Sequence, residues 1–77
     1  MADRIHEAFR YRRADAVRIY NLHVVADGVE LWRVTEIAGQ PSQSVKETGF
    51  SGVEAAAQFL DEVERTLTAG GWRREGD

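Results

Sequence analysis

The feature that most constrains the fold is a run of apolar residues at helical spacing between Phe50 and Trp72. These residues recur every three or four positions and predict one amphipathic helix over residues 52–69. The positions that form its apolar stripe are Val53, Ala56, Ala57, Leu60, Val63 and Leu67. A helix with a single apolar stripe must bury it against a second layer, so the rest of the chain is expected to supply that layer.

Both ends of the predicted helix carry cap signals. Ser51 and Glu54 have the spacing of a capping box, in which each side chain accepts a backbone N–H of the other. Phe50 precedes the box and is placed to pack over the first turn. Gly70-Gly71 predicts the end of the helix, because glycine adopts the left-handed conformation of a C-cap without a steric clash.

The sequence before the helix predicts three or four β-strands joined by short turns, at residues 8–13, 17–26, 29–38 and 44–48. Asp27-Gly28 favours a type I′ hairpin turn. Both faces of the third predicted strand are partly apolar, so either the Leu31 face or the Trp32 face can meet the helix. The expected fold is α+β, an antiparallel meander of three or four strands with one C-terminal α-helix packed across the sheet.

The length of 77 residues predicts a single small domain over residues 1–77, with a frayed N-terminus at 1–7 and a tail at 73–77. Domains of this size have a thin stability margin, which leaves self-association open. The chain has no cysteine, which excludes disulfides and thiolate chemistry. No apolar run approaches the length of a membrane span, and we expect a cytoplasmic protein without a membrane partner.

Nothing in the sequence predicts an enzyme, a metal site or a cofactor. His6 and His23 do not have the spacing of metal ligands. The neighbouring acidic residues Asp61, Glu62 and Glu64 diverge around the helix axis and do not form a carboxylate pair. Glycine-rich phosphate loops are absent from the sequence. We therefore predict a non-catalytic protein with no cofactor and no small-molecule substrate.

Charge is unevenly distributed along the chain. The net charge is −3, which disfavours general nucleic-acid binding. Residues 1–20 nevertheless hold five arginines against three acidic residues, whereas residues 41–77 hold four basic and seven acidic residues. A surface that binds phosphates is therefore expected on the first strands, away from the helix.

The stretch from Phe50 to Trp72 resembles the C-terminal half of a WGR domain. That family has a Phe-Ser entry, a Glu-Ala helix start and a final Gly-aromatic pair, which correspond here to Phe50-Ser51, Glu54-Ala55 and Gly71-Trp72. Upstream, Trp32 precedes Gly39-Gln40 at a spacing similar to that of the family signature, and Ile19-Tyr20 resembles the start of its central hairpin. Trp32 is followed by Arg33-Val34 and not by Gly-Arg, so only part of the signature is present.

The resemblance covers about residues 17–74 and implies the fold described above. WGR domains accompany the catalytic part of poly(ADP-ribose) polymerases and occur in bacterial proteins, where they contact nucleic acid and neighbouring domains. The resemblance therefore implies a small DNA-binding module. The candidate nucleic-acid-binding residues are Arg10, Arg12, Arg18, Trp32 and Arg33.

Each candidate has a structural alternative. Trp32 either stacks on a base or packs under the helix, and we favour packing under the helix. The arginines either follow a phosphate backbone or keep a strand edge soluble. The competing function is that of a protein-interaction or self-associating module, in which a sheet face or edge strand binds another protein or a second copy of the chain.

Overall fold

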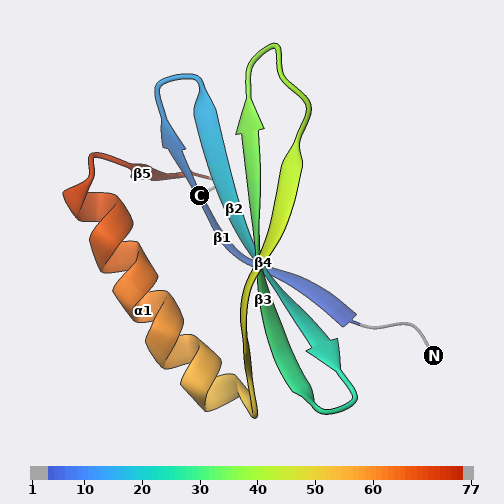
Figure 1. Cartoon of the computed structure of the whole chain (residues 1–77). Helices are drawn as coiled ribbons and strands as arrows, with labels where there is room; N and C mark the ends of the chain where they lie inside the picture. The colour runs from blue at the N-terminus through green and yellow to red at the C-terminus, as the bar shows by residue number, and fades with distance from the viewer. Residues whose placement is uncertain (1–3, 76–77) are drawn as a thin grey trace.

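A computed structural model describes residues 4–75 as a five-stranded antiparallel sheet with one helix packed across it, which confirms the expected α+β class. The sheet order is β4-β3-β2-β1-β5. The elements in chain order are β1 (Arg4–Arg13), β2 (Ala16–Val25), β3 (Gly28–Ile37), β4 (Gln43–Phe50), α1 (Val53–Ala69) and β5 (Arg73–Glu75). Figure 1 shows α1 lying along one side of the strongly twisted sheet.

The two ends of the sheet extend beyond the predicted strands. Residues 4–7, expected to be frayed, belong to β1, and residues 73–75, expected to be a tail, form β5. β5 pairs with β1, with Tyr11 opposite Arg74. Residues 1–3 and 76–77, which the same predictions covered, lie outside the described residues. Three-residue β5 has no apolar alternation of its own, so only its pairing partner defines it as a strand.

The hairpin between β2 and β3 forms at the predicted place with a different turn. Ala26 and Asp27 are the turn residues, and neither has a positive φ, so the predicted type I′ turn is wrong. The positive φ is found instead at Gly28, the first residue of β3, where φ is +150°. A Cβ at this position would lie 2.2 Å from the carbonyl oxygen of Phe50, so glycine allows β3 and the end of β4 to approach closely.

The predicted capping box at the start of α1 is wrong. Gly52 is the N-cap residue, and no side chain forms a cap hydrogen bond. The helix begins one residue later than expected, which puts Ser51 outside the N-cap position that the box requires. Phe50 does pack on the helix, since its ring lies 5.4 Å from that of Phe59. Val53, predicted in the apolar stripe, is 63% exposed.

The C-terminal end of α1 follows the prediction. Gly71 has the left-handed φ of +89°, the Gly71 N–H donates to the Thr68 carbonyl, and the Trp72 N–H donates to the Leu67 carbonyl at 3.0 Å. This pair of hydrogen bonds is the Schellman motif. Trp72 packs against the core cluster that includes Leu67, so the motif turns the chain back towards the sheet.

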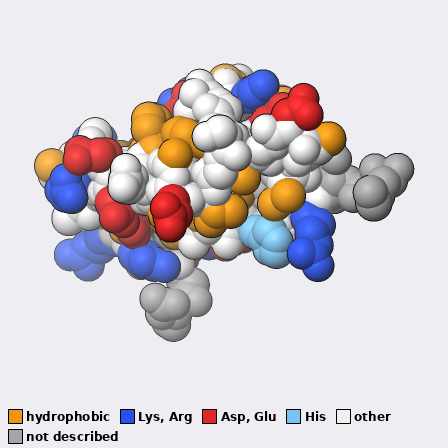
Figure 2. Space-filling model, turned by 90° about the horizontal axis from the view of Figure 1, so that it is seen from below, with side chains coloured by type: hydrophobic (Ala, Val, Ile, Leu, Met, Phe, Trp, Pro, Cys, Tyr) orange, Lys and Arg blue, Asp and Glu red, His pale blue; other side chains and the backbone are white. Residues whose placement is uncertain are grey.

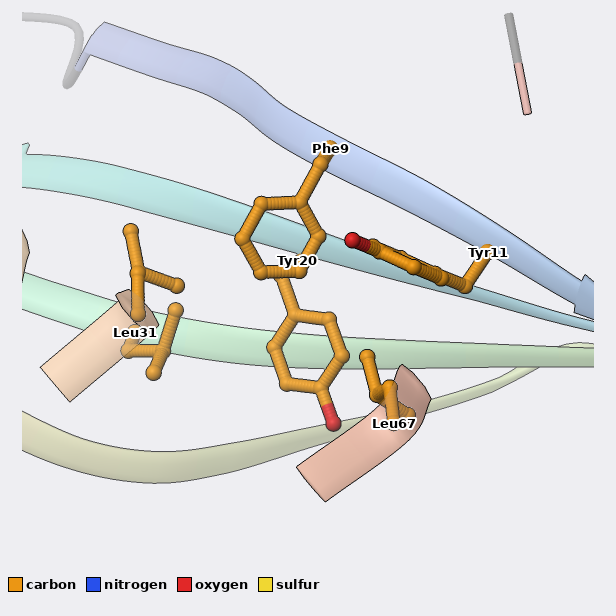
Figure 3. Close-up of a cluster of buried hydrophobic side chains, with 6 residues drawn as sticks. Phe9, Tyr11, Tyr20, Leu31 and Leu67 are labelled. Atoms are coloured by element: carbon orange, nitrogen blue, oxygen red, sulfur yellow. The ribbon is translucent and has the colours of Figure 1, made fainter. Parts of the chain in front are cut away.

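The core lies between α1 and one face of the sheet. Figure 3 shows its aromatic and aliphatic side chains between the strands and the helix. The buried cluster consists of Phe9, Tyr11, Tyr20, Leu31, Leu60 and Leu67. Leu31 is fully buried, so the Leu31 face of β3 meets the helix and the Trp32 face does not. In the described part of the chain, no helix is long and apolar enough to cross a membrane.

Candidate interaction surface

The face of the sheet opposite α1 is covered by no other element of residues 4–75, and we call it the open face. Successive residues of a strand point to opposite faces, and paired residues on neighbouring strands share a face. Tyr20 and Leu31 point to α1, so the residues next to them in sequence point to the open face. Its central residues are Val17, Ile19, Asn21 and His23 of β2 and Trp32 and Val34 of β3.

The centre of the open face is apolar and aromatic. Val17 and Ile19 are 7% and 8% exposed although no helix lies over them, and Trp32 and Val34 are half-buried. The rings of His23 and Trp32 stack with centroids 5.2 Å apart and planes 17° from parallel. The predicted packing of Trp32 under the helix is therefore wrong. Its ring instead forms part of a surface on the other side of the sheet.

The nitrogen at the edge of the Trp32 ring contacts Glu30, which also pairs with Lys46. The indole Nε1 donates a hydrogen bond of 3.0 Å to Glu30, and Lys46 of β4 lies 3.2 Å from the same carboxylate. The hydrogen bond from Trp32 is the largest cause that lowers the pKa of Glu30, followed by that from Lys46. These contacts favour the ionised form of Glu30 and join the indole ring to its carboxylate.

The arginines of β1 on the open face are also paired. Arg10 Nη2 lies 2.6 Å from Glu7, and Arg12 pairs with Glu75 of β5. The hydrogen bond from Arg10 lowers the pKa of Glu7, and the hydrogen bond to Glu75 raises the pKa of Arg12. Both arginines therefore reach the surface with a carboxylate beside them.

A β-bulge explains why Glu7 reaches Arg10. Residues three apart in a regular strand point to opposite faces. The register of β1 against β2 shifts between Glu7 and Phe9, which inserts an extra residue and brings Glu7 to the face of Arg10. No turn or glycine in this part of the sequence marks the bulge, so the sequence pattern did not reveal the pairing.

The charge of the open face is balanced. The pairing of the strands places four basic and four acidic side chains on it: Arg10, Arg12, Lys46 and Arg73, and Glu7, Glu30, Glu36 and Glu75. Three of the four basic side chains form an ion pair within this set. Figure 2 shows the molecule from below, where basic and acidic side chains both lie among hydrophobic ones.

The two other predicted nucleic-acid residues point to the side of α1. Arg18 lies opposite Tyr11 and Thr35 on the helix-covered face, with its guanidinium carbon 4.9 Å from the centroid of the Trp72 ring. Arg33 lies opposite Tyr20 and pairs with Glu47 at 3.2 Å. The structure thus brings Arg10, Arg12 and Trp32 to one face of the sheet and Arg18 and Arg33 to the other.

No group of three or more His, Asp or Glu side chains within residues 4–75 is arranged to hold a metal ion. Comparisons of the chain with protein-family models, with curated proteins and with solved structures found no match. The resemblance to a WGR domain therefore stays a prediction, and functional inference depends on the geometry of the chain itself.

Proposed function

We propose that the chain is a protein-interaction module that binds a second copy of itself through the open face. The observation that carries this proposal is the composition of that face. Its apolar centre around Trp32 and Val34 lies on the uncovered side of the sheet, and its rim carries equal numbers of both charges. An apolar centre with a polar rim is typical of protein–protein interfaces.

The charge balance favours a second copy over a polyanion. A nucleic-acid surface gains affinity from basic side chains that neutralise phosphates and release counterions. Arg10 and Arg12 are each already beside a carboxylate, which a phosphate would have to displace. In a twofold pairing of two open faces, the ion pairs within each copy can stay in place, because each face carries equal numbers of both charges.

The dimensions of the face fit such a pairing. Strands of ten residues at the standard rise and spacing make a sheet face of roughly 34 by 20 Å, or about 700 Å². A stable protein–protein interface buries about 800 Å² on each partner. Pairing would also cover Trp32 and Val34, which a single copy leaves half-buried on this side of the sheet.

The test is analytical ultracentrifugation of the whole chain over a concentration range from micromolar to about 1 mM. We expect a reversible monomer–dimer equilibrium that Val34→Glu weakens by at least tenfold, because the new carboxylate would be buried without a partner. Val53→Glu is the matched control. It adds the same charge at an exposed site on the first turn of α1 and leaves the equilibrium unchanged.

A monomer over the whole concentration range would overturn the proposal, as would equal effects of the two variants. The nucleic-acid hypothesis is tested in parallel by fluorescence anisotropy with labelled single-stranded and blunt-ended DNA at low salt. Salt-sensitive DNA binding that Arg10→Gln and Arg12→Gln weaken, in a chain that stays monomeric, would favour DNA as the partner.

A further inference from the structure

A groove on the other side of the sheet has a different character from the open face. It lies between β2 and α1 and has a volume of about 270 Å³. Its apolar wall consists of Tyr20 from the sheet and Phe59, Val63 and Leu67 from the helix. Phe59 is 39% exposed, so part of this wall is open to solvent.

Arg18 lines the groove and is the chemically unusual residue in it. Its Nε atom is buried and has no hydrogen-bond partner. Within residues 4–75, no carboxylate forms an ion pair with Arg18, and its guanidinium group lies over the face of the Trp72 ring. Arg10, Arg12 and Arg33 each have a carboxylate partner. Arg18 as a whole is only half-buried and lines the groove, so its guanidinium charge is available there without a carboxylate beside it, which favours an anionic ligand at this point.

The second charged residue of the groove limits the charge of that ligand. Glu62 also lines the groove, where its largely exposed carboxylate pairs with Arg65 at 2.7 Å. One negative charge beside Arg18 is compensated, whereas a doubly charged phosphate would also be repelled by Glu62. The volume of about 270 Å³ is just below the usual range of roughly 300–1,000 Å³ for ligand pockets, which fits a small molecule with one apolar group.

We propose that this groove binds a small monocarboxylic acid with an aromatic or branched apolar body. The carboxylate accepts hydrogen bonds from the Arg18 guanidinium, whose planar donors match a carboxylate in geometry. The apolar body lies against Tyr20 and Phe59. This site is independent of the proposed function, because Arg18 and the open face lie on opposite sides of the sheet.

The test is a titration of the ¹⁵N-labelled full chain with 3-phenylpropionate, followed by NMR. We expect a saturable shift of the Trp72 indole signal, since Arg18 lies over that ring, with a Kd on the order of 1 mM for a ligand of this size. The neutral analogue 3-phenylpropionamide is expected to bind at least tenfold more weakly, because it lacks the charge that Arg18 compensates.

Two variants and one control locate the site. Arg18→Gln is expected to weaken binding at least tenfold, whereas Arg10→Gln, on the opposite face, leaves it unchanged. Should Arg18→Gln unfold, Phe59→Ser supplies the same information, because the ring is partly exposed and its loss removes the apolar contact without removing the core.

Three results would overturn the proposal. The first is the absence of a saturable shift at Trp72, and the second is equal affinity for the acid and the amide. The third is binding of a peptide that ends in phenylalanine without binding of the free acid, which would identify a peptide terminus as the occupant.

Discussion

The hydroxyl of Tyr11 donates a hydrogen bond of 2.5 Å to Oε2 of Glu64, and Arg74 lies 3.1 Å from the same oxygen. This contact joins β1 to α1 across the edge of the core, and Arg74 adds β5 to it. Tyr11 is 5% exposed, so its hydroxyl meets Glu64 at the boundary between core and solvent. One carboxylate therefore links β1 to α1 and β5, which lie at the other end of the sequence.

Replacing Tyr11 with phenylalanine is expected to lower the free energy of unfolding by about 1–2 kcal/mol, since a hydrogen bond to a charged acceptor is lost. A double-mutant cycle with Glu64→Gln, followed by urea denaturation at pH 7, isolates the interaction and should give a coupling of about 1 kcal/mol. A coupling of zero would mean that the hydroxyl and the carboxylate do not stabilise each other.

The same variant should change the response to alkaline pH. Burial is the largest cause that raises the pKa of Tyr11 above its ordinary value of 10.0, and the hydrogen bond to Glu64 raises this pKa further. The unfolded chain then releases this proton first, so the wild-type protein loses stability as the pH rises above about 10. In Tyr11→Phe this part of the loss is absent, and its denaturation midpoint should fall less between pH 9 and pH 11.

Gly28 is expected to tolerate no side chain. In Gly28→Ala, the new Cβ would meet the Phe50 carbonyl oxygen at 2.2 Å, and alanine disfavours a φ of +150°. We expect a loss of about 2 kcal/mol or more in the free energy of unfolding. Gly39→Ala is the matched control, because Gly39 has a φ of +80° and no atom within 4 Å of an added Cβ.

Gly39→Ala should therefore lower the free energy of unfolding only through the strain of alanine at a positive φ, about 1 kcal/mol. Chemical denaturation of both variants separates the two contributions. If Gly28→Ala is no more destabilising than Gly39→Ala, the close approach of β3 and β4 at Phe50 is not present in solution.

The hydrogen bond between Trp32 and Glu30 is expected to make the free energy of unfolding fall as the pH is lowered into the acidic range. The contacts lower the folded-state pKa of Glu30 below 4.5, so their contribution is present above that pH and is lost as the pH falls through the folded-state pKa. An NMR titration of the Glu30 carboxyl carbon measures this pKa. Trp32→Phe should raise it, because the indole is the main donor, and Lys46→Met should raise it less.

An unchanged pKa of Glu30 in Trp32→Phe would show that the indole does not donate to this carboxylate. Denaturation of wild type and Glu30→Gln between pH 7 and pH 3 provides the independent measurement. Over this range the unfolding free energy of Glu30→Gln should fall less than that of wild type, because the variant lacks the titrating group.

The elements with strong local patterns were predictable from sequence, and the contacts between distant segments were not. The stripe containing Leu60 and Leu67 and the glycines after Ala69 correctly predicted the helix and its end. β5 was not predicted, because Arg73–Glu75 has no apolar pattern of its own and only its pairing with β1 makes it a strand. The Ser51–Glu54 box failed because a one-residue change in the helix start moves both side chains out of position.

The candidate site was harder to predict because it depends on which face each side chain occupies. Alternation in β1 correctly separated Phe9 and Tyr11 from Arg10 and Arg12. It could not show that Arg18 and Arg33 point to the helix, because both sides of β2 and β3 are mixed in polarity. The carboxylates beside the arginines come from a bulge and from β5, and neither leaves a local signal.

The register that joins β5 to β1 also governs how the chain folds. The hydrogen bond between Arg12 and Glu75 spans 63 residues, so this edge of the sheet can form only after the sequence between them has been synthesised and has begun to fold. Until then the outer backbone groups of Arg10–Arg12 in β1 lack the partner that β5 supplies and can pair with another nascent chain. β5 therefore protects this part of the β1 edge only late in folding, and conditions that delay the pairing of β5 with β1 should favour aggregation through β1.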